Sequence, residues 1–372
     1  PLTSFQSTNV IVGAGLSGLM LSESLIERGE EVTLIGPSDT RVQTICTWRR
    51  KDEPSQYAKH VINSWDQWQF SFGDHEQTHV GDRYIYEALD GQSLKKALEL
   101  RLARSSGFER IVETVEHSQQ IDNGFEITTK SARYTADNLF DSRPPEFASN
   151  TLAQQFFGIV VPTKCLREKL THPKLMDFTL PQRFDNALAF TYILPLTDDT
   201  TLIEATLFAR SQVPYEQLRD MAVEWLTANT DRDFNDDIIL YDESGCLPMG
   251  DVIPRFAGNP IGLASGSARP CSGYALSGLE KQLRRLTQQN GYSAVSNTPY
   301  SKLSAWMDNI FLRVLNRDPR IGESIFSAMT HGLSGDRFAG FMTDNFTGID
   351  ALRLIATLPK SPFIRAVLKN DN

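Results

Sequence analysis

The 372-residue chain is poor in cysteine, and its four cysteines (Cys46, Cys165, Cys246 and Cys271) form no CxxC pair. This spacing argues against a disulfide framework and against a structural zinc site, and it fits a reducing compartment. Long apolar runs are missing too. No stretch approaches the roughly 18 apolar residues that a membrane-spanning helix needs.

Basic residues are fewer than acidic residues. The chain carries 37 Lys and Arg against 46 Asp and Glu, a formal net charge of −9. Because nucleic-acid binding needs clustered cations, we expect no nucleic-acid partner. The first residues lack the charged and apolar regions of a signal peptide, so we expect a cytoplasmic protein. A peripheral contact with the inner face of a membrane stays open, and nothing in the composition indicates an oligomeric state.

What the chain does contain is a mixed pattern of strands and helices. Asn9–Gly13 and Glu31–Gly36 are apolar runs on either side of a helical segment, the pattern of a βαβ unit with a parallel sheet. Thr197–Thr200 joins two strand-like runs as a hairpin. Further strands are expected at Trp65–Phe72, Phe125–Thr129, Arg133–Phe140, Ala187–Leu196, Thr201–Phe208 and Ile261–Ala264, and helices at Ser93–Leu102, Gln217–Ala228, Gly278–Gln289 and most of the chain from Ser301 on.

The first apolar run leads into a complete GxGxxG: Gly13, Ala14, Gly15, Leu16, Ser17 and Gly18. In a dinucleotide-binding turn, Gly13 turns the chain, Gly15 lets backbone amides approach a pyrophosphate, and Gly18 lets the helix pack on the sheet. The helix N-terminus offers N–H groups and a positive dipole end to the phosphates. Because a strand precedes the turn and a helix follows it, an accidental glycine-rich turn is the weaker interpretation.

The acidic residue that usually ends the second strand and binds the ribose hydroxyls is missing. Leu34-Ile35 runs into Gly36-Pro37 instead, and Asp39 lies slightly beyond. Either Asp39 or the backbone at this strand end is therefore expected to hold the ribose.

One motif points to zinc but lacks the right context. His75-Glu76-Gln77-Thr78-His79 matches HExxH, which binds zinc when both histidines lie on one face of a helix. Gly73-Asp74 and Gly81-Asp82 flank it, so too little chain remains for a stable helix. We interpret the segment as a solvated turn between strands and expect no metal site.

Several later segments occur in an order that resembles the bacterial lycopene β-cyclases, flavoproteins with the fold of the aromatic hydroxylases. The resemblance covers nearly the whole chain. Thr47-Trp48 matches the end of the family's His-Thr-Trp, and Phe140–Arg143 is similar to Ile-Asp-Gly-Arg. Leu202–Thr206 is similar to Leu-Ile-Glu-Asp-Thr, and Glu243–Pro248 to Gln-Gly-x-Leu-Pro. The segment from Gly266 through Arg269–Tyr274 resembles Gly…His-Pro-Thr-Thr-Gly-Tyr.

The resemblance implies that the cofactor is FAD, active in its reduced form, with NAD(P)H as the external reductant. A helix N-terminus after the loop at Tyr274 would stabilise negative charge on a reduced flavin. Ala205, Ser142 and Arg269 depart from the family pattern and could alter substrate choice. The expected cofactor contacts are the glycine turn, Gly36, Asp141, Gly266, Arg269, Pro270, Ser272, Gly273 and Tyr274.

The expected fold is α/β: a Rossmann-type FAD-binding domain, an inserted antiparallel β-sheet substrate domain and a C-terminal helical segment. The FAD-binding domain is assigned to residues 1–60, 91–145 and 250–290. The substrate-binding domain is assigned to residues 61–90 and 146–249, and the helical region to residues 291–372.

Glu204 is the candidate acid. In its strand, a period of two places it on one face with Leu202, Thr206 and Phe208, and simple hairpin pairing places Ile193 opposite. Apolar neighbours would raise the pKa of the carboxyl and keep it protonated near neutral pH, the state in which it can protonate an alkene. From the pattern alone, a solvated glutamate on an edge strand is favoured over a catalytic acid. The family resemblance makes the catalytic acid the favoured interpretation.

The resemblance implies an intramolecular lyase, an isomerase that closes the linear isopropylidene end of lycopene or a similar polyene into a β-ionone ring. Trp48, Phe156, Phe157, Tyr192 and Phe208 are the candidate substrate-pocket residues, since aromatic faces attract cations. Ile349–Leu368 mixes apolar and basic residues and could lie on an anionic leaflet, with a packed helix pair as the alternative. The competing functions are an FAD-dependent monooxygenase of the aromatic-hydroxylase type and a non-catalytic flavin or carotenoid carrier. A cyclase of another polyene end group also stays open.

Overall fold

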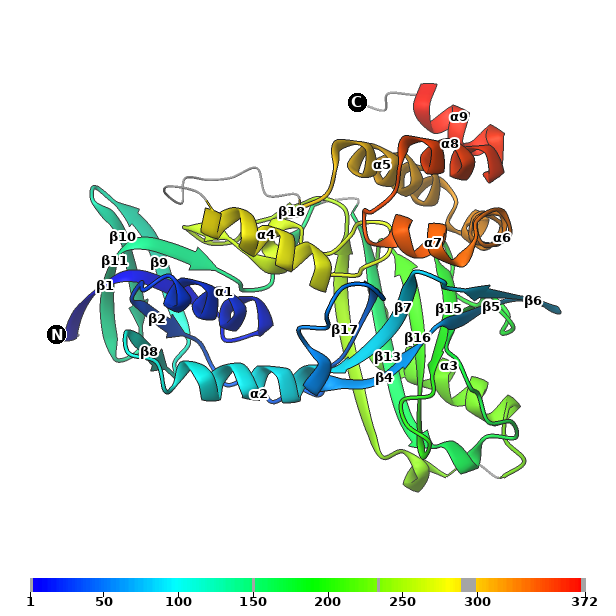
Figure 1. Ribbon diagram of the computed structural model, residues 1–372, viewed down its shortest axis with the longest axis horizontal. Helices are drawn as coiled ribbons and strands as arrows, with labels where there is room; N and C mark the ends of the chain where they lie inside the picture. The colour runs from blue at the N-terminus through cyan, green and yellow to red at the C-terminus, as the bar shows by residue number, and fades with distance from the viewer. Residues whose placement is uncertain (1–2, 149–150, 233–234, 289–298, 369–372) are drawn as a thin grey trace.

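Two large β-sheets lie side by side, with a layer of helices over one of them (Figure 1). The computed structural model describes residues 3–148, 151–232, 235–288 and 299–368. The predicted domain boundary at residues 290 and 291 lies outside these ranges, and the domain ranges stay a prediction.

The first sheet is built on the βαβ unit. Strand β1 (Thr3–Val12) pairs in parallel with β2 (Val32–Ile35), and α1 (Leu16–Glu27) connects them. The sheet has the order β8-β2-β1-β11-β10-β9, with β19 beside β11. Its other strands are β8 (Phe108–Ile111), β9 (Val115–Ile121), β10 (Gly124–Thr129), β11 (Ala132–Asp141) and β19 (Asn259–Pro260). Leucines of α1, α2 (Gly91–Leu102) and α4 (Leu276–Gln288) form one apolar core with β1 and β2. The Rossmann-type fold is thereby confirmed.

The second sheet has the order β17-β13-β16-β15-β14-β5-β6. Its strands are β5 (Gln67–Phe72), β6 (His75–Val80), β13 (Leu152–Pro162), β14 (Lys174–Asp177), β15 (Leu188–Leu194), β16 (Thr200–Ala209) and β17 (Tyr241–Met249). One face packs against α3 (Tyr215–Ala228) through an apolar cluster, and the other joins a large aromatic core. The sheet is mixed rather than purely antiparallel, because β14 and β5 run in parallel.

A small sheet joins the two large ones. It has the order β3-β7-β4, formed by β3 (Thr44–Arg50), β7 (Tyr84–Asp90) and β4 (Val61–Trp65). Strand β3 falls in the predicted FAD-binding range, whereas its partner β7 and the next strand, β4, fall in the predicted substrate-binding range. Short β12 (Glu146–Phe147) and β18 (Val252–Ile253) pair separately.

Helices cover the aromatic face of the second sheet (Figure 1). They are α5 (Lys302–Arg317), α6 (Gly322–Gly332), α7 (Gly335–Met342), α8 (Gly348–Thr357) and α9 (Lys360–Leu368), and they confirm the helical C-terminal segment. The short 3-10 turns are η1 (Ala58–His60), η2 (Thr163–Cys165), η3 (Asp236–Ile238), η4 (Gly262–Ser265) and η5 (Pro319–Ile321). Within the described ranges, no helix is both long and apolar enough to cross a bilayer.

Three local predictions are wrong. The run Trp65–Phe72 is divided, because β4 ends at Trp65 and β5 begins at Gln67 in a different sheet. Ile261–Ala264 is not a strand: Gly262 has a φ of +65°, and the 3-10 turn η4 begins there. The HExxH segment is neither a zinc helix nor a solvated turn. It forms β6, where His79 is buried and Nε2 donates to the carbonyl oxygen of Thr330, 2.6 Å away.

Candidate active site

Glu204 lies in the middle of β16, on the face of the second sheet that looks toward the aromatic core. Leu202 and Phe208, on the same face, belong to that core, whereas Ile203 and Ala205 pack on the α3 side. The expected alternation is therefore confirmed. The hydroxyl of Thr206 donates to Glu204 Oε1 at 2.9 Å, which leaves Oε2 as the atom to carry a proton.

Tyr192 of β15, and not the expected Ile193, pairs with Glu204 of β16. In the hairpin turn, the N–H of Thr197 donates to the carbonyl of Thr200, a pairing that would place Ile193 opposite Glu204 if it continued. The pairing shifts by one residue between Leu194 and the turn, where Pro195 has no N–H to donate and its carbonyl accepts from Asn63 instead. The shift brings a tyrosine, rather than an aliphatic side chain, beside the carboxyl.

A second glutamate, Glu243 of β17, approaches Glu204 across β13. Both glutamates pair with the same residue of β13, Gly158. A Cβ added at Gly158 would lie 3.4 Å from Glu204 Cβ, 3.5 Å from Glu243 Cγ and 2.7 Å from Leu202 Cδ1. Because residue 158 is a glycine, the Leu202 side chain fills the space over it, between the two carboxyl-bearing side chains.

The electrostatics of the pair follow from burial and like charge. Burial raises the pKa of Glu204 to about 8, with Glu243 adding to the rise and the Thr206 hydrogen bond opposing it. Burial also raises the pKa of Glu243 to about 7, although Glu243 Oε2 accepts from the backbone N–H of Thr44 at 2.8 Å. Glu204 can thus stay protonated near neutral pH, as the sequence predicts.

Aromatic rings surround the acid on the side opposite β17. The hydroxyl of Tyr86 bonds to those of Tyr192 and Tyr274, the latter at 3.1 Å. The ring of Trp48 lies 4.6 Å from that of Tyr86 and 4.8 Å from that of Tyr274, centroid to centroid. The thiol of Cys46, also near Tyr192, has its pKa raised by burial and stays neutral. The structure thus places Tyr192 beside Glu204 and Trp48 behind it, against Tyr86 and Tyr274, and their role as substrate-pocket residues stays a prediction.

The other predicted pocket residues divide between the two faces of the sheet. Phe156 shares the face of Glu204, and Phe208 lies farther along that face against Phe190 and Phe326. Phe157 points to the opposite face and packs near Tyr215 of α3, because neighbouring residues of a strand alternate in direction. The structure does not bring Phe157 to the site.

The glycine turn has the geometry of a phosphate cradle. Gly13 has a φ of +102°, and a Cβ on Gly18 would lie 2.0 Å from the Gly13 carbonyl oxygen, so neither position tolerates a side chain. Gly15, the N-cap of α1, makes no side-chain cap hydrogen bond and has no atom within 4 Å of where its Cβ would be. Open space thus lies in front of unpaired helix N–H groups, which fits a pyrophosphate.

The strand ends beside the turn are closely packed. A Cβ on Gly36 would lie 2.9 Å from the backbone nitrogen of Ala14. Asp39 already accepts from Arg41 and from Lys95 at 2.9 Å, and the Asp141 carboxylate accepts from Arg143. Both predicted acidic contacts with the cofactor are therefore engaged with cations of the chain itself, and the ribose contact stays a prediction.

The loop from Gly266 to Tyr274 crosses from the glycine turn to the site face of the second sheet. Gly273 has a φ of +76°, and a Cβ there would lie 2.3 Å from Oε1 of Gln154, which shares a face with Glu204. Buried oxygens of Gln154 and Ser272 have no hydrogen-bond partner among the described residues. Orphaned acceptors at this loop fit a polar ligand such as a flavin ring.

The side chain of Arg269 is directed away from this loop. It is fully buried, pairs with Asp308 of α5 at 3.2 Å and lies 4.3 Å above the ring of Phe341. The guanidinium therefore joins the loop to the helical layer, and any cofactor contact of Arg269 is left to its backbone. Pro270 lies part-buried beside it.

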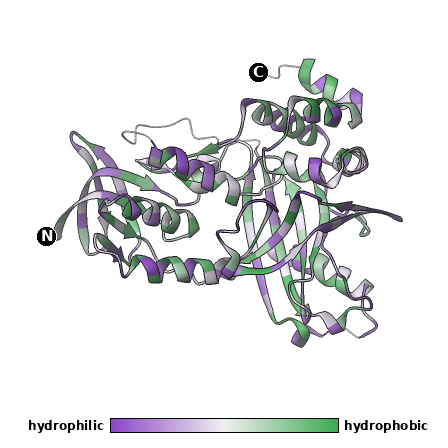
Figure 2. Ribbon diagram, in the orientation of Figure 1, coloured by the Kyte–Doolittle hydropathy of each residue, from purple (hydrophilic) through white to green (hydrophobic). Residues whose placement is uncertain are grey.

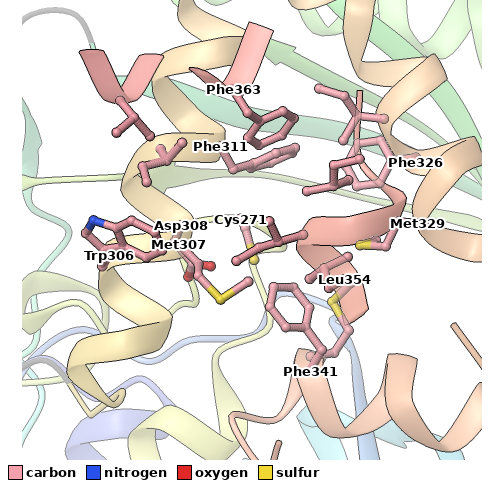
Figure 3. A pocket seen from close by; sticks show the side chains of 16 residues that line it. Cys271, Trp306, Met307, Asp308, Phe311, Phe326, Met329, Phe341, Leu354 and Phe363 are labelled. Carbon is pink, nitrogen blue, oxygen red and sulfur yellow. The ribbon is translucent and has the colours of Figure 1, made fainter. Parts of the chain in front are cut away.

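An apolar cavity of about 120 Å³ lies within the helical layer (Figure 3). Phe311, Phe326, Phe341 and Phe363 lie around it, with Cys271 of the Gly266–Tyr274 loop at its inner side. An engineered cavity of about 150 Å³ holds benzene, so this one suits a group the size of an isoprene unit. Trp306, Ile355 and Val367 line the cavity and are also exposed, which places its mouth at the protein surface.

Sequence reasoning missed Glu243, Tyr86 and Gln154. Glu243 falls inside the matched segment Glu243–Pro248, and Gln154 lies two residues before the candidate Phe156, but their roles depend on which strands are neighbours, and a single sequence does not give strand order. The isolated Gly158 in an apolar strand was the available signal, because such a glycine often marks a close approach of other groups.

Comparison with known proteins identifies a family for this chain. The family model described as "Lycopene cyclase protein" matches residues 9–368. Lycopene beta-cyclase of Pseudescherichia vulneris is 34% identical over 121 residues, covering 29% of this chain and 28% of that protein. The chloroplastic neoxanthin synthase of Solanum tuberosum is 24% identical over 296 residues, covering 71% of this chain and 56% of that protein. The alignments thus span less than two thirds of either relative.

Solved structures share the fold at low sequence identity. A geranylgeranyl bacteriochlorophyll reductase-like protein of Thermoplasma acidophilum superposes with a TM-score of 0.59 and 10% identity, covering 97% of this chain and 98% of its own. Xcc4156, a flavin-dependent halogenase of Xanthomonas campestris, has a TM-score of 0.58 and 13% identity, covering 100% of this chain and 92% of its own. The fold is therefore one that flavin-dependent enzymes use.

Proposed function

The chain belongs to the lycopene cyclase protein family, and on this premise we propose that it is a flavin-dependent, redox-neutral cyclase. Its substrate is lycopene or a similar polyene with a linear isopropylidene end, and its product carries a β-ionone ring. The observation that carries the proposal is Glu204, a carboxyl whose burial beside Glu243 raises its pKa to about 8.

The reaction needs an acid that is protonated at neutral pH, and Glu204 supplies it. Proton transfer from Glu204 to the terminal double bond gives a tertiary carbocation, which a neighbouring double bond attacks to close the ring. Loss of a ring proton to a carboxylate ends the reaction. No hydride leaves or enters the substrate, so the product is an isomer.

An aromatic wall lies on the Tyr192 side of Glu204 and would face the cation. Tyr192 borders the acid, Trp48 packs behind it on Tyr86 and Tyr274, and ring faces of this kind attract a developing positive charge. Phe156 extends the same face along β13. A dry, aromatic site also prevents water from capturing the carbocation before the ring proton is lost.

The open cradle at Gly15 and the orphaned oxygens of Gln154 and Ser272 fit FAD. The glycine turn would hold the pyrophosphate and the Gly266–Tyr274 loop the flavin ring. When bound in its reduced form, with NAD(P)H as reductant, FAD supplies a negative charge that stabilises the cation.

Expression in lycopene-producing cells tests the proposal. We expect the wild-type chain to convert lycopene to pigments with β-ionone rings and Glu204→Gln to accumulate lycopene while it still binds flavin. Asp242→Asn removes a neighbouring exposed carboxylate and should behave as wild type. Hydroxylated pigments would instead support a monooxygenase, and unchanged lycopene with bound pigment would support a carrier.

The outer face of α8 and α9 supports a peripheral membrane contact on the inner leaflet. Leu352, Ile364 and Leu368 are 67%, 53% and 77% exposed, and both helices carry hydrophobic residues at the edge of the molecule (Figure 2). Arg353 and Arg365, on the same helices, have no acidic partner among the described residues, a pattern that suits an anionic lipid surface. The cavity mouth opens beside this face, so a polyene could enter from the bilayer.

Liposome flotation tests the membrane contact. The chain should float with anionic vesicles, and the double variant Leu352→Glu with Ile364→Glu should stay in the soluble fraction. Leu100→Glu, which changes an equally exposed leucine of α2, is the matched control. Equal flotation of the double variant and the control would remove α8 and α9 as the contact.

A further inference from the structure

Two carboxyls, not one, occupy the site face of the second sheet. Glu204 of β16 and Glu243 of β17 pair with the two sides of Gly158, so the three residues lie in one row across three strands. A residue with a side chain at Gly158 would stand between them, since its Cβ would lie 3.4 Å from Glu204 Cβ and 3.5 Å from Glu243 Cγ.

The backbone of β3 holds Glu243 in place. Glu243 Oε2 accepts from the N–H of Thr44 at 2.8 Å, and Glu243 is only 6% exposed. No lysine, arginine or histidine pairs with either glutamate in the part of the chain that the structure describes. A buried carboxylate without a cation is expensive for the fold and calls for a role other than stability.

The groups that face the pair from the neighbouring elements are neutral. Cys46 comes from β3, Tyr192 from β15 and Tyr274 from the loop before α4, and burial raises the pKa of each. Thr206 donates to Glu204 from the same strand. Glu243 is therefore the charged group that acts on Glu204.

We propose that Glu243 is a positioning residue for the cyclisation: its fixed carboxylate keeps the proton on Glu204 and adds negative charge beside the cation. This role of Glu243 in cyclisation rests on the proposed function. Glu204 has the higher pKa of the two carboxyls, about 8 against about 7, so as the pH rises Glu243 loses its proton first and the last proton stays on Glu204.

The proton balance closes within the pair and the substrate. The Glu204 O–H bond breaks, its electron pair stays on the carboxylate, and a C–H bond forms on the polyene. Both glutamates are then anionic while the substrate carries one positive charge. When the ring C–H bond breaks, its electrons form the ring double bond and the proton returns to the pair. No oxidant or reductant is consumed.

Infrared titration of the flavin-loaded protein tests the pair without any catalysis. The wild-type spectrum should contain a protonated-carboxyl band that disappears on titration above neutral pH, and Glu204→Gln should lack it. In Glu243→Gln the midpoint of this band should fall by about one pH unit, because the like charge is gone. Asp242→Asn, which removes the exposed carboxylate next in sequence, should leave the midpoint unchanged.

The rate of cyclisation against pH supplies the second measurement. The alkaline limb of kcat should move to lower pH in Glu243→Gln by the same shift as the infrared midpoint, and KM should change little. Glu243→Asp should restore part of the wild-type limb, since it returns the charge.

A wild-type midpoint in folded Glu243→Gln would overturn the inference. If Glu243→Gln is folded but inactive at every pH, the infrared midpoint alone settles the role of Glu243. If the wild-type chain does not cyclise lycopene, the proposed function is wrong. The infrared midpoint of Glu243→Gln then still tests whether Glu243 acts on Glu204.

Discussion

Gly158 and Glu204 lie opposite one another on β13 and β16, and a Cβ on the glycine would stand 3.4 Å from that of the glutamate. The same Cβ would lie 2.7 Å from Leu202 Cδ1. The lack of a side chain at residue 158 therefore makes room both for Glu204 and for the Leu202 side chain beside it.

Gly158→Ala should displace the Leu202 side chain, which lies on the same face as Glu204, and reduce cyclisation by at least about tenfold, with a loss of about 1–3 kcal/mol in the free energy of unfolding from overpacking. Activity and denaturant unfolding are measured together. Gly348→Ala, at a position with no atom within 4 Å of the added Cβ, is the control. Full activity in Gly158→Ala would contradict the tight arrangement.

The stability of the protein should depend on the ionisation of the pair. Burial raises the pKa of Glu204 to about 8 and of Glu243 to about 7, so the folded state retains protons that the unfolded state releases near pH 4.5. Stability is thus fully present below about pH 4.5 and is lost as the pH rises through about 8, by a few kcal/mol.

Glu204→Gln should therefore be more stable than wild type at about pH 9 and nearly equal to it at about pH 5. Urea unfolding at both pH values measures the difference. Exposed Glu168→Gln should show no such change between the two conditions. A constant difference between Glu204→Gln and wild type would mean that the carboxyl is not buried.

The glycine turn at the start of α1 predicts that one substitution can weaken cofactor binding without lowering the stability of the fold. Gly15→Ala adds a Cβ where no atom lies within 4 Å, so the fold should be unaffected while flavin binding weakens by about tenfold or more. Gly18→Ala, whose Cβ would meet the Gly13 carbonyl at 2.0 Å, should lose both. Flavin fluorescence and thermal unfolding distinguish the two. Normal flavin affinity in Gly15→Ala would place the pyrophosphate elsewhere.

The buried pair of Arg269 and Asp308 should hold the flavin-side loop to the helical layer. Asp308→Asn leaves a fully buried guanidinium without its anion and should cost about 3–5 kcal/mol in the free energy of unfolding. Asp198→Asn breaks an exposed pair with Lys169 and should cost less than about 1 kcal/mol. Equal stability of the two variants would show that the buried pair is dispensable.

The sequence predicts features that local chemistry determines. The βαβ unit and its glycine turn follow from apolar periodicity and from glycine geometry, and they appear where expected. The alternation that places Glu204 beside Leu202 and Phe208 follows from the strand period.

Features that depend on long-range pairing could not be predicted from one sequence. The shift at Pro195 exchanged Ile193 for Tyr192, and the order β17-β13-β16 brought Glu243 to Glu204. The pairing of Arg269 with Asp308 likewise required knowing that α5 covers the Gly266–Tyr274 loop. Glu243 and Asp308 are distant in sequence from their partners, and within the hairpin the shift arises at a proline between the strand and its turn.

The most direct test of the central claim is the mass of the product formed from lycopene in D₂O. Because Glu204 exchanges its proton with solvent before donating it, each new ring should carry one deuterium and no added oxygen. Glu204→Gln should give no labelled product. A product with added oxygen, or a ring without deuterium, would contradict an acid-initiated, redox-neutral cyclisation.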